Sequence, residues 1–253
     1  MKNNEMNILY GRNPVREALR SGREADSLYI QDSIENNIQE IIGLAKKNQI
    51  PVKKVPKSKI DSMVEFESGE KGLNHQGVVL KVPSVSYSTL DDAVKLAEER
   101  NEPLFLVALD GIEDPHNLGA IVRSAEIFGA HGVIIPKRRS AGMSATASKS
   151  ASGAEEYIPI IKVTNLASFI DEVKEMGVFV ACADMDGQSL YRSNLKGAMM
   201  IVIGSEGQGV SRLVRERSDF VVSIDMYGHI NSLNASSAAA VIMYEKKRQD
   251  MMK

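Results

Sequence analysis

Apolar and polar residues are arranged along the chain in two patterns that together predict an α/β protein. From residue 104 onward, short and nearly continuous apolar runs recur, separated by segments with apolar positions three or four residues apart. Runs of the first kind are typical of strands buried on both faces, and the second spacing is typical of helices. The pattern therefore predicts a parallel sheet covered by helices on both faces. Strands are expected at 104–109, 132–136, 157–161, 178–183, 199–203 and 220–224.

The first 82 residues show a smaller pattern of the same kind, with short strands and helices. Its first helix is expected within 13–20, because Asn13 can cap it and Pro14 suits the first helical position. The run PSVSYS at 83–88 is typical of a linker, and a helix at 90–100 follows. We therefore expect a small domain at 1–82, a linker and connecting helix at 83–102, and a larger domain at 103–253. Within 1–82, strands are expected at 27–30, 52–55 and 77–82, with helices at 34–47 and 57–66.

Composition excludes several classes of protein. The 253 residues are 43% apolar, enough for a sizeable core, and the formal net charge is only −2. Nucleic-acid binding would therefore need local basic patches. Cys182 is the only cysteine and the four histidines are far apart, so we expect neither a disulfide nor a metal site. Because no apolar run is long enough for a membrane span or a signal peptide, a cytoplasmic location is expected.

Polar residues follow the strand expected at 104–109, in the segment DGIEDPHNLGAIVRSAEIFGA at 110–130. Asn117 is well placed to cap the helix that starts there, and Arg123 lies one step from its apolar stripe. Both residues also have a purely structural explanation. Asn117 could be a cap and nothing more, and Arg123 could be exposed or paired with Glu126.

A glycine-rich segment, IVIGSEGQGV at 201–210, follows another expected strand. Three glycines in six residues permit unusual backbone angles and close approach of a ligand. Their order differs from the dinucleotide fingerprint G-x-G-x-x-G, and no G-K-[ST] of a phosphate-binding loop is present. Glu206 within the segment argues against an anionic ligand.

A polar run opens the last helix, in GHINSLNASSAAAVIMYEKKR at 228–248. Five Ser or Asn side chains fall between Asn231 and Ser237, although a helix needs only one cap, for which Ser232 or Asn234 is suitable. A capped helix with a small-residue packing face is the alternative explanation. Ligands of open α/β sheets bind at the carboxyl ends of strands. Because all three segments follow strands, we expect them to converge on one site.

Together these segments resemble the SpoU (TrmH-like) family of SPOUT methyltransferases, which methylate ribose 2′-hydroxyls of RNA with S-adenosylmethionine. The resemblance rests on DPHNLGAIVR at 114–123, IGSEGQG at 203–209 and IDMYGHINSLNAS at 224–236. It implies a C-terminal α/β domain with a parallel sheet and a deep trefoil knot, although general topology rules predict an unknotted chain. It also implies a homodimer with the active site at the subunit interface.

Other segments resemble the subgroup of this family that modifies a guanosine in 23S ribosomal RNA. These segments are YGRNPVREAL at 10–19, HQGVV at 75–79, and the stretch 136–160. The resemblance implies that 1–82 is a small α/β domain that binds the substrate and has a fold like that of a ribosomal protein. Three alternatives remain open: a tRNA 2′-O-methyltransferase, an enzyme for an rRNA position linked to antibiotic resistance, and a catalytically silent RNA-binding or ribosome-assembly factor. A nicotinamide-dependent enzyme is disfavoured by the glycine order in 204–209.

The resemblance also implies roles for single residues. Arg123 would promote attack by the ribose hydroxyl; since arginine is always protonated, electrostatic stabilisation is a safer description than general base. Asn117, Ser232 and Asn234 would orient Arg123, the ribose and the methyl donor, with Ser236 as a candidate support. The expected cofactor-binding residues are Ala183, Ile203, Gly204, Glu206, Ile224 and Leu233. RNA contact is expected at Lys137, Arg138 and Arg139, and less strongly at Arg12, Lys53, Lys54 and Lys57 of the first domain; the alternative is that these are solvated surface charges.

Overall fold

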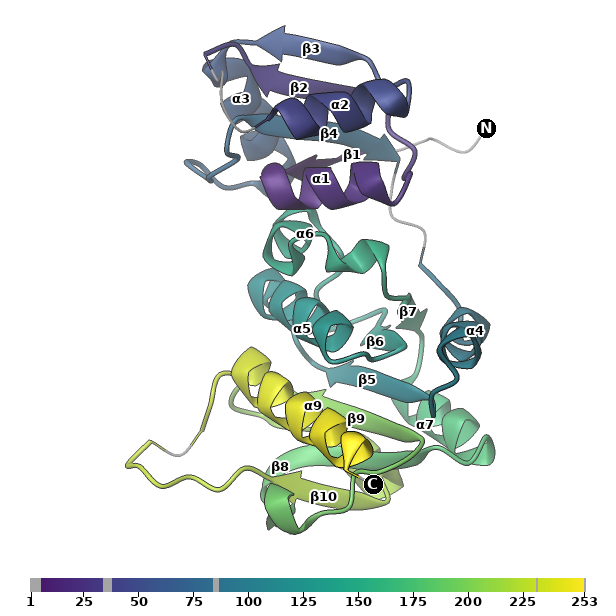
Figure 1. Ribbon diagram of the computed structural model, residues 1–253. Helices are drawn as coiled ribbons and strands as arrows, with labels where there is room; N and C mark the ends of the chain where they lie inside the picture. Colours follow the sequence, from purple (N-terminus) through teal and green to yellow (C-terminus); the bar gives the residue numbers. More distant parts are fainter. Residues whose placement is uncertain (1–5, 34–37, 84–86, 231, 253) are drawn as a thin grey trace. The chain divides into compact units, whose positions relative to one another are not determined.

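The computed structural model describes residues 6–33, 38–83, 87–230 and 232–252. The chain folds into two compact units, each built around its own sheet (Figure 1). The first unit contains residues 1–86 and 143–157, and the second contains 87–142 and 158–253. In the described part of the chain, every helix is too short or too polar to cross a bilayer.

The first unit has a four-stranded mixed sheet in the order β1-β4-β2-β3. Strands β2 and β3 are parallel, whereas β4 runs antiparallel to both β1 and β2. Apolar residues of α1 and α2 cover one face of the sheet, and those of α3 pack on the other. The elements are β1 (Met6–Tyr10), α1 (Arg12–Arg20), β2 (Ser27–Gln31), α2 (Gln39–Lys47), β3 (Val52–Val55), α3 (Lys57–Ser68) and β4 (Val78–Pro83).

The start of this unit differs from the sequence expectation. Residues Met6–Tyr10 form a strand, and α1 begins at Arg12, directly after Gly11. Gly11 has a φ of 93°, a left-handed angle that lets the chain turn from β1 straight into α1. Asn13 therefore lies inside the helix and does not cap it. The expected start of the second helix at 34–37 lies outside the described residues.

The segment 143–157 belongs to the first unit, whereas the sequence pattern predicts that it is part of the domain at 103–253. It forms α6 (Ala145–Ala151) and a short 3₁₀ helix, η1 (Ala154–Glu156). Ala145 packs in the same apolar cluster as Tyr10, and Arg23 Nη1 lies 2.6 Å from Glu156 Oε1. These contacts join residues more than 130 positions apart, so local sequence patterns do not reveal them.

Glu155 lies in this segment, and burial raises the pKa of its carboxyl to about 7. The pKa is therefore above its ordinary value of 4.5, and the unfolded chain releases the proton first. The free energy of unfolding should fall as pH rises between these two values. We expect Glu155→Gln to raise the free energy of unfolding at pH 8 by about 3 kcal/mol, with little gain at pH 5.

Urea unfolding of both proteins at pH 5 and pH 8 measures this effect. Glu24→Gln, which alters an exposed carboxylate of the same unit, is the matched control. An equal effect of Glu155→Gln at both pH values would contradict a raised pKa for this carboxyl.

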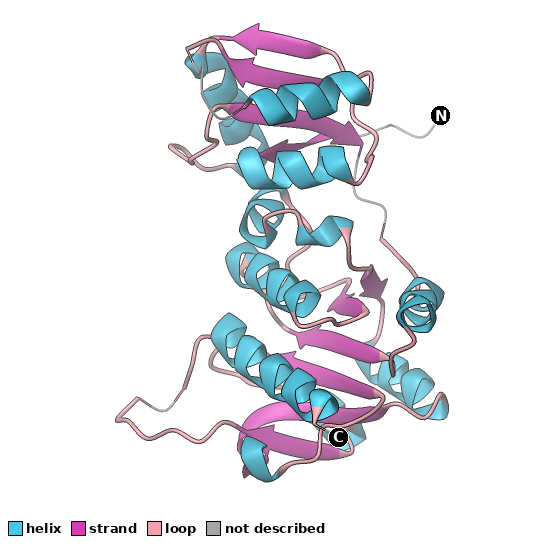
Figure 2. Cartoon of the chain, in the orientation of Figure 1, coloured by secondary structure: helices cyan, strands magenta, loops and turns pink. Residues whose placement is uncertain are grey.

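The second unit has a six-stranded sheet in the order β10-β8-β9-β5-β6-β7, and all its described pairings are parallel. This confirms the parallel sheet predicted from the apolar runs. Helices lie on both faces, as Figure 2 shows. The strands are β5 (Phe105–Asp110), β6 (Gly132–Pro136), β7 (Ile160–Val163), β8 (Phe179–Ser189), β9 (Met199–Gly204) and β10 (Phe220–Ser223). The helices are α4 (Leu90–Arg100), α5 (Pro115–Ile127), α7 (Leu166–Glu175), α8 (Arg212–Arg217) and α9 (Ala235–Met251).

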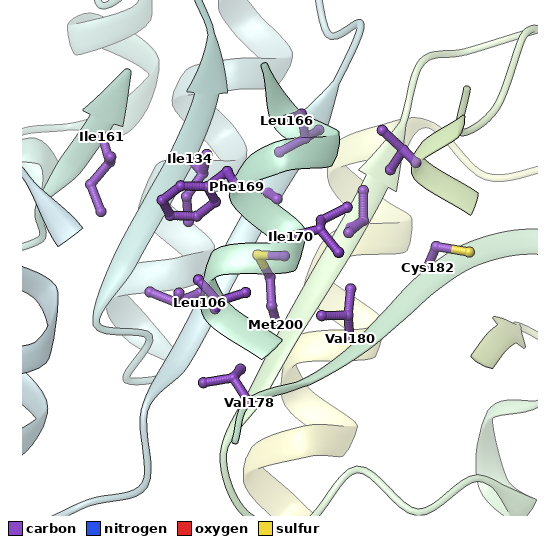
Figure 3. Close-up of a cluster of buried hydrophobic side chains, with 14 of the residues drawn as sticks. Leu106, Ile134, Ile161, Leu166, Phe169, Ile170, Val178, Val180, Cys182 and Met200 are labelled. Carbon is purple, nitrogen blue, oxygen red and sulfur yellow. The ribbon is translucent and has the colours of Figure 1, made fainter. Parts of the chain in front are cut away.

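The core of this unit is continuous under one layer of helices. Phe169 and Ile170 of α7 lie over Leu106, Val180 and Met200 of the sheet (Figure 3). Helices α4 and α8 add apolar residues to the same cluster, while α5 and α9 contact each other on the opposite face. The lone cysteine, Cys182, is fully buried in this cluster, as expected for an inert structural thiol.

Strand β8 is longer than expected and carries a bulge. Cys182 pairs with Val221, but the next residue of β10, Val222, pairs with Gln188. Residues 183–187 therefore have no ladder partner in β10, although the Ser223 hydroxyl donates to the Gly187 carbonyl at 2.9 Å. Arg215 of α8 contacts this bulge, with Nη1 2.9 Å from Asp184 and Nη2 2.8 Å from Asp186. The guanidinium lowers the pKa of the Asp186 carboxyl, and the contacts hold the bulge beside the end of β9.

Candidate active site

Three segments that are far apart in the sequence meet at the carboxyl edge of the six-stranded sheet. They are the start of α5, the loop 204–209 after β9, and the start of α9. Glu206 joins them, because its Oε1 accepts hydrogen bonds from Asn117 Nδ2 (3.2 Å), Asn234 Nδ2 (2.6 Å) and the backbone N–H of Ala235 (3.2 Å). Asn234 Nδ2 also lies 2.9 Å from Asn117 Oδ1. We call Asn117, Glu206 and Asn234 the Glu206 cluster.

Asn117 is available to this cluster because another residue caps α5. The cap is Asp114, whose Oδ1 accepts a hydrogen bond from the backbone N–H of His116 at 2.9 Å. Pro115 occupies the first turn, where a missing N–H costs nothing. The expectation that Asn117 caps this helix is therefore wrong. Its side chain instead reaches across to the loop after β9.

Asn234 is the N-cap of α9. This confirms one of the two residues that the sequence offered for this role, Ser232 and Asn234. Its Oδ1 accepts hydrogen bonds from the backbone N–H groups of Ser236 (3.0 Å) and Ser237 (3.4 Å) and from the Ser236 hydroxyl (2.6 Å). Both ends of the Asn234 amide are thus used, the oxygen for the helix and the nitrogen for the Glu206 cluster. A Ser or Asp at this position could cap the helix but could not make both sets of contacts.

The loop 204–209 is closed tightly on itself. Two backbone hydrogen bonds, of 3.1 and 3.0 Å, join Ser205 and Gly209. A Cβ on Gly204 would come within 2.1 Å of the carbonyl carbon of Gly209, so a side chain does not fit there. The backbone N–H of Ser211 donates to Asp110 Oδ2 at 2.7 Å, which ties the end of this loop to β5. The loop therefore presents Glu206 from a fixed position.

Arg123 and Ser232 lie near the cluster in sequence but differ from it in their surroundings. Arg123 is exposed on α5, six residues after Asn117, which corresponds to about 9 Å along the helix axis. Ser232 is exposed and makes no hydrogen bond among the described residues. Asn231, which belongs to the polar run, lies outside the described residues. The structure thus brings Asn117, Glu206 and Asn234 together by hydrogen bonds, although Glu206 and Asn234 are exposed like Ser232, and it leaves Ser232 outside this set.

The expected cofactor-binding residues lie at the ends of three neighbouring strands. Ile203 is buried at the end of β9 next to Gly204, Ala183 is in the β8 bulge, and Ile224 follows β10. Leu233 is 39% exposed just before α9. The backbone groups of residues 226–230, 232 and 233 make no hydrogen bond among the described residues, so they can bind a ligand.

Three consecutive basic side chains lie at the same edge of the sheet. Lys137, Arg138 and Arg139 are exposed in the turn after β6. The backbone N–H of Ala141 donates to the Ile112 carbonyl at 2.8 Å, which ties this turn to the loop that leads into α5. We call Lys137, Arg138 and Arg139 the basic turn. Arg12, the fourth expected RNA-binding residue, belongs to the first unit.

Sequence reasoning missed two contributions to this site. Asp110 anchors the loop after β9, and its position directly after a strand was the available signal. Glu206 was expected to shape a cofactor loop, but its role as the common acceptor of three donors depends on tertiary contacts. Only the fold shows that Asn117 and Asn234, 117 residues apart, share that acceptor.

Two family models match the chain and between them cover most of it. One, described as the SpoU rRNA Methylase family, matches residues 104–244. The other, described as RNA 2′-O ribose methyltransferase substrate binding, matches residues 8–88. The three segments of the candidate site fall within the first match.

Similar proteins agree with these matches. A Bacillus subtilis (strain 168) protein named for the TrmH family of tRNA/rRNA methyltransferases, YacO, is 45% identical over 242 residues, covering 94% of each chain. The solved structure of the SpoU methyltransferase AviRb from Streptomyces viridochromogenes, in complex with AdoMet, has a TM-score of 0.79 at 23% identity, covering 96% of this chain and 90% of that one. An AdoMet-bound rRNA methyltransferase from Sinorhizobium meliloti has a TM-score of 0.76 at 22% identity, covering 98% and 88%. The two structures share the fold of this chain.

Proposed function

Because the chain belongs to the SpoU rRNA methylase family, we propose that it transfers a methyl group from S-adenosylmethionine to a ribose 2′-hydroxyl of RNA. The observation that supports this most is the Glu206 cluster, which joins the three motif segments at one edge of the sheet. Arg123 projects from the same helix that supplies Asn117. A silent RNA-binding factor is disfavoured because the polar residues of the motifs, Asn117, Arg123, Ser232 and Asn234, are all present.

The reaction requires a weak nucleophile to attack. A ribose hydroxyl has a pKa far above 7, so negative charge develops on its oxygen as its proton leaves to water or to a phosphate of the RNA, while the oxygen takes the methyl group from the donor. A fixed cation next to that oxygen stabilises the charge. We assign this role to Arg123, because the guanidinium stays protonated and cannot easily remove a proton itself. Asn117 and Asn234, held by Glu206, would position the ribose.

The free groups around this edge fit S-adenosylmethionine, which supplies an electrophilic methyl group when bound. Backbone groups at 226–230, 232 and 233, which make no hydrogen bond among the described residues, can hydrogen-bond a purine ring or hydroxyl groups, and Leu233 and Met226 offer partly exposed apolar contacts. Gly204, Ile203, Ala183 and Ile224 complete the expected set. The Glu206 carboxylate suits a cationic methyl donor better than an anionic ligand.

We further propose that the target is a guanosine in 23S rRNA. The support is the resemblance of 10–19, 75–79 and 136–160 to the subgroup with that specificity, together with the substrate-binding match at 8–88. A tRNA ribose is the alternative target, because YacO is named for both RNA classes. The deep trefoil knot and the cytoplasmic location stay predictions.

A homodimer with the active site at its interface is part of the proposal. Helices α5 and α9 contact each other and carry large apolar side chains that are exposed in the single chain. Ile127 is 61% exposed, Tyr244 58% and Val241 41%. Covering these residues with a second copy would bury apolar surface next to Arg123.

The basic turn should contribute to RNA affinity. Reversing its charge, with Lys137→Glu, Arg138→Glu and Arg139→Glu together, places three negative charges where the phosphates are expected to pass. We expect at least about a 10²-fold loss of RNA affinity at 100 mM salt and a shallower dependence on salt. Filter binding with 23S rRNA at several salt concentrations measures both. Unchanged affinity would show that the turn is simply solvated surface.

A methyl-transfer assay tests the reaction itself. The full chain is incubated with methyl-labelled S-adenosylmethionine and 23S rRNA or tRNA purified from cells that lack the gene. Alkali cleaves RNA except next to a 2′-O-methylated ribose, so label in alkali-resistant dinucleotides identifies the 2′-oxygen. Label only in mononucleotides would instead indicate base methylation, and no label in either RNA would favour the silent-binder alternative.

A further inference from the structure

The first unit contains a hollow that no part of the proposed methyl-transfer chemistry uses. It has a volume of about 570 Å³ and lies between α1, the start of α3 and the loop before β4. This volume is within the usual range of small-molecule sites, about 300–1,000 Å³. Its lining includes two cations, Arg12 and Lys57, and three amide side chains, Gln31, Asn74 and Gln76. We call it the Arg12 hollow.

Two sequence motifs of this unit are joined in its wall. Gln76 Oε1 accepts hydrogen bonds from the backbone N–H of Arg12 (2.8 Å) and from Lys149 Nζ (3.0 Å). Gln76 has a φ of 53°, which is uncommon for a residue other than glycine. Strained backbone of this kind persists where the surroundings fix it, often at binding sites. Since the oxygen takes both donors, Gln76 Nε2 keeps two N–H groups without a partner among the described residues.

The rest of the loop is fixed by its own contacts. His75 Nδ1 accepts from the backbone N–H of Gly77 at 2.9 Å, and its Nε2 lies 2.8 Å from Asp61 Oδ1. Asn74 Oδ1 accepts from the backbone N–H of Gln76 at 3.1 Å. The one carboxylate in the lining, Asp61, is therefore already paired. The loop offers preformed donors and needs no rearrangement to bind.

Arg12 has hydrogen-bonding capacity that the protein does not use. Its Nε is buried, and it has no hydrogen-bond partner among the described residues. Buried polar groups in native proteins are nearly always paired, so such a group points to a missing partner. Arg12 also lines a second hollow of about 650 Å³, together with Arg16 and Gln76.

We propose that the Arg12 hollow binds one unstacked nucleotide of the substrate RNA, with its phosphate on Arg12 and Lys57 and its base edge on the amides of Gln31, Asn74 and Gln76. This inference rests on the proposed function for the identity of the ligand as RNA. Cations alone would suit any anion, but the amide N–H groups of Gln76 and Asn74 add donors, and Gln31, whose Nε2 already donates to Ser33 Oγ, adds an acceptor, as base edges require. Sequence-specific RNA recognition usually targets unstacked bases in loops and bulges. The hollow would thus contribute to the choice of target RNA.

The test measures binding of four fluorescein-labelled hexamers, rA6, rG6, rC6 and rU6, to the full chain by fluorescence anisotropy. We expect Arg12→Gln to weaken binding of all four hexamers about tenfold and to leave their ranking unchanged, because it removes a phosphate contact. Lys57→Gln should weaken all four similarly and reduce the salt slope by about 1. Lys59→Gln, which removes an exposed charge from the same helix outside the hollow, is the matched control and should change affinity by about twofold or less. Thermal unfolding confirms that each variant is folded.

The proposal is overturned if the wild-type chain binds none of the hexamers, or if Arg12→Gln and Lys59→Gln behave alike. The methyl-transfer assay separates this failure from failure of the proposed function. If the hollow is as proposed, Arg12→Gln raises KM for 23S rRNA about tenfold and leaves kcat within about twofold. A wild-type chain that methylates no RNA, but binds hexamers through Arg12, would refute the proposed function and leave the hollow standing.

Discussion

Arg123→Ala is expected to abolish methyl transfer, with kcat lowered by about 10³-fold or more. The guanidinium is the group assigned to stabilise charge on the ribose oxygen, and alanine removes it completely. Arg123 is exposed on α5, so its loss should change Tm by no more than about 2 °C. Single-turnover assays with saturating RNA measure the chemical step separately from binding.

Arg212→Ala is the matched control for this substitution. Arg212 is also on a helix of the second unit, its side chain is 89% exposed, and it pairs only with Glu216 among the described residues. It should keep wild-type turnover. Normal turnover by a folded Arg123→Ala variant would refute the assignment of Arg123.

Glu206→Ala is expected to lower kcat/KM about 10²-fold, because it removes the common acceptor of three donors. Asn117 and Asn234 would keep the single hydrogen bond between them but lose their fixed positions. Gln208→Ala, in the same loop and without a described hydrogen bond, is the control and should have little effect.

A double-mutant cycle sharpens this prediction. If Glu206 acts by holding Asn117, then Glu206→Ala and Asn117→Ala should not be additive, and the double variant should resemble Glu206→Ala alone. Additive effects in free energy would show that the two side chains act independently. That result would contradict the role of the Glu206 cluster as one unit.

Sequence patterns predicted the second unit well because its strands are buried on both faces. Apolar runs such as 104–109 and 199–203, separated by helical segments, are typical of the central strands of a parallel sheet. Patterns were less reliable where tertiary contacts decide the outcome. The extension of β8 beyond Ala183 depends on the pairing of Gln188 and Val222, which no local signal contains.

The candidate site was predictable in outline for a similar reason. Parallel strands end at one edge, so polar segments after β5, β9 and β10 had to lie near one another. Which side chains bond was not predictable. Asn117 is suitable as a cap by propensity, but Asp114 and Pro115 start the helix earlier and leave its amide available for Glu206.

Segment 143–157 belongs to the first unit, whereas the residues on either side of it in the sequence belong to the second. Its Ala and Ser residues suggest a small helix of the larger domain, yet α6 packs on β1 of the first unit. The ion pair between Arg23 and Glu156 and the buried carboxyl of Glu155 depend on that placement.

The most direct test of the proposed function is a map of 2′-O-methylation across rRNA and tRNA, from cells with and without the gene. We expect one guanosine of 23S rRNA to lose its methyl group when the gene is absent. Wild-type protein, but not Arg123→Ala, should restore the methyl group in the same cells. If no 2′-O-methylated position changes, the proposed function is contradicted. If Arg123→Ala restores the methyl group fully, the catalytic role of Arg123 is contradicted.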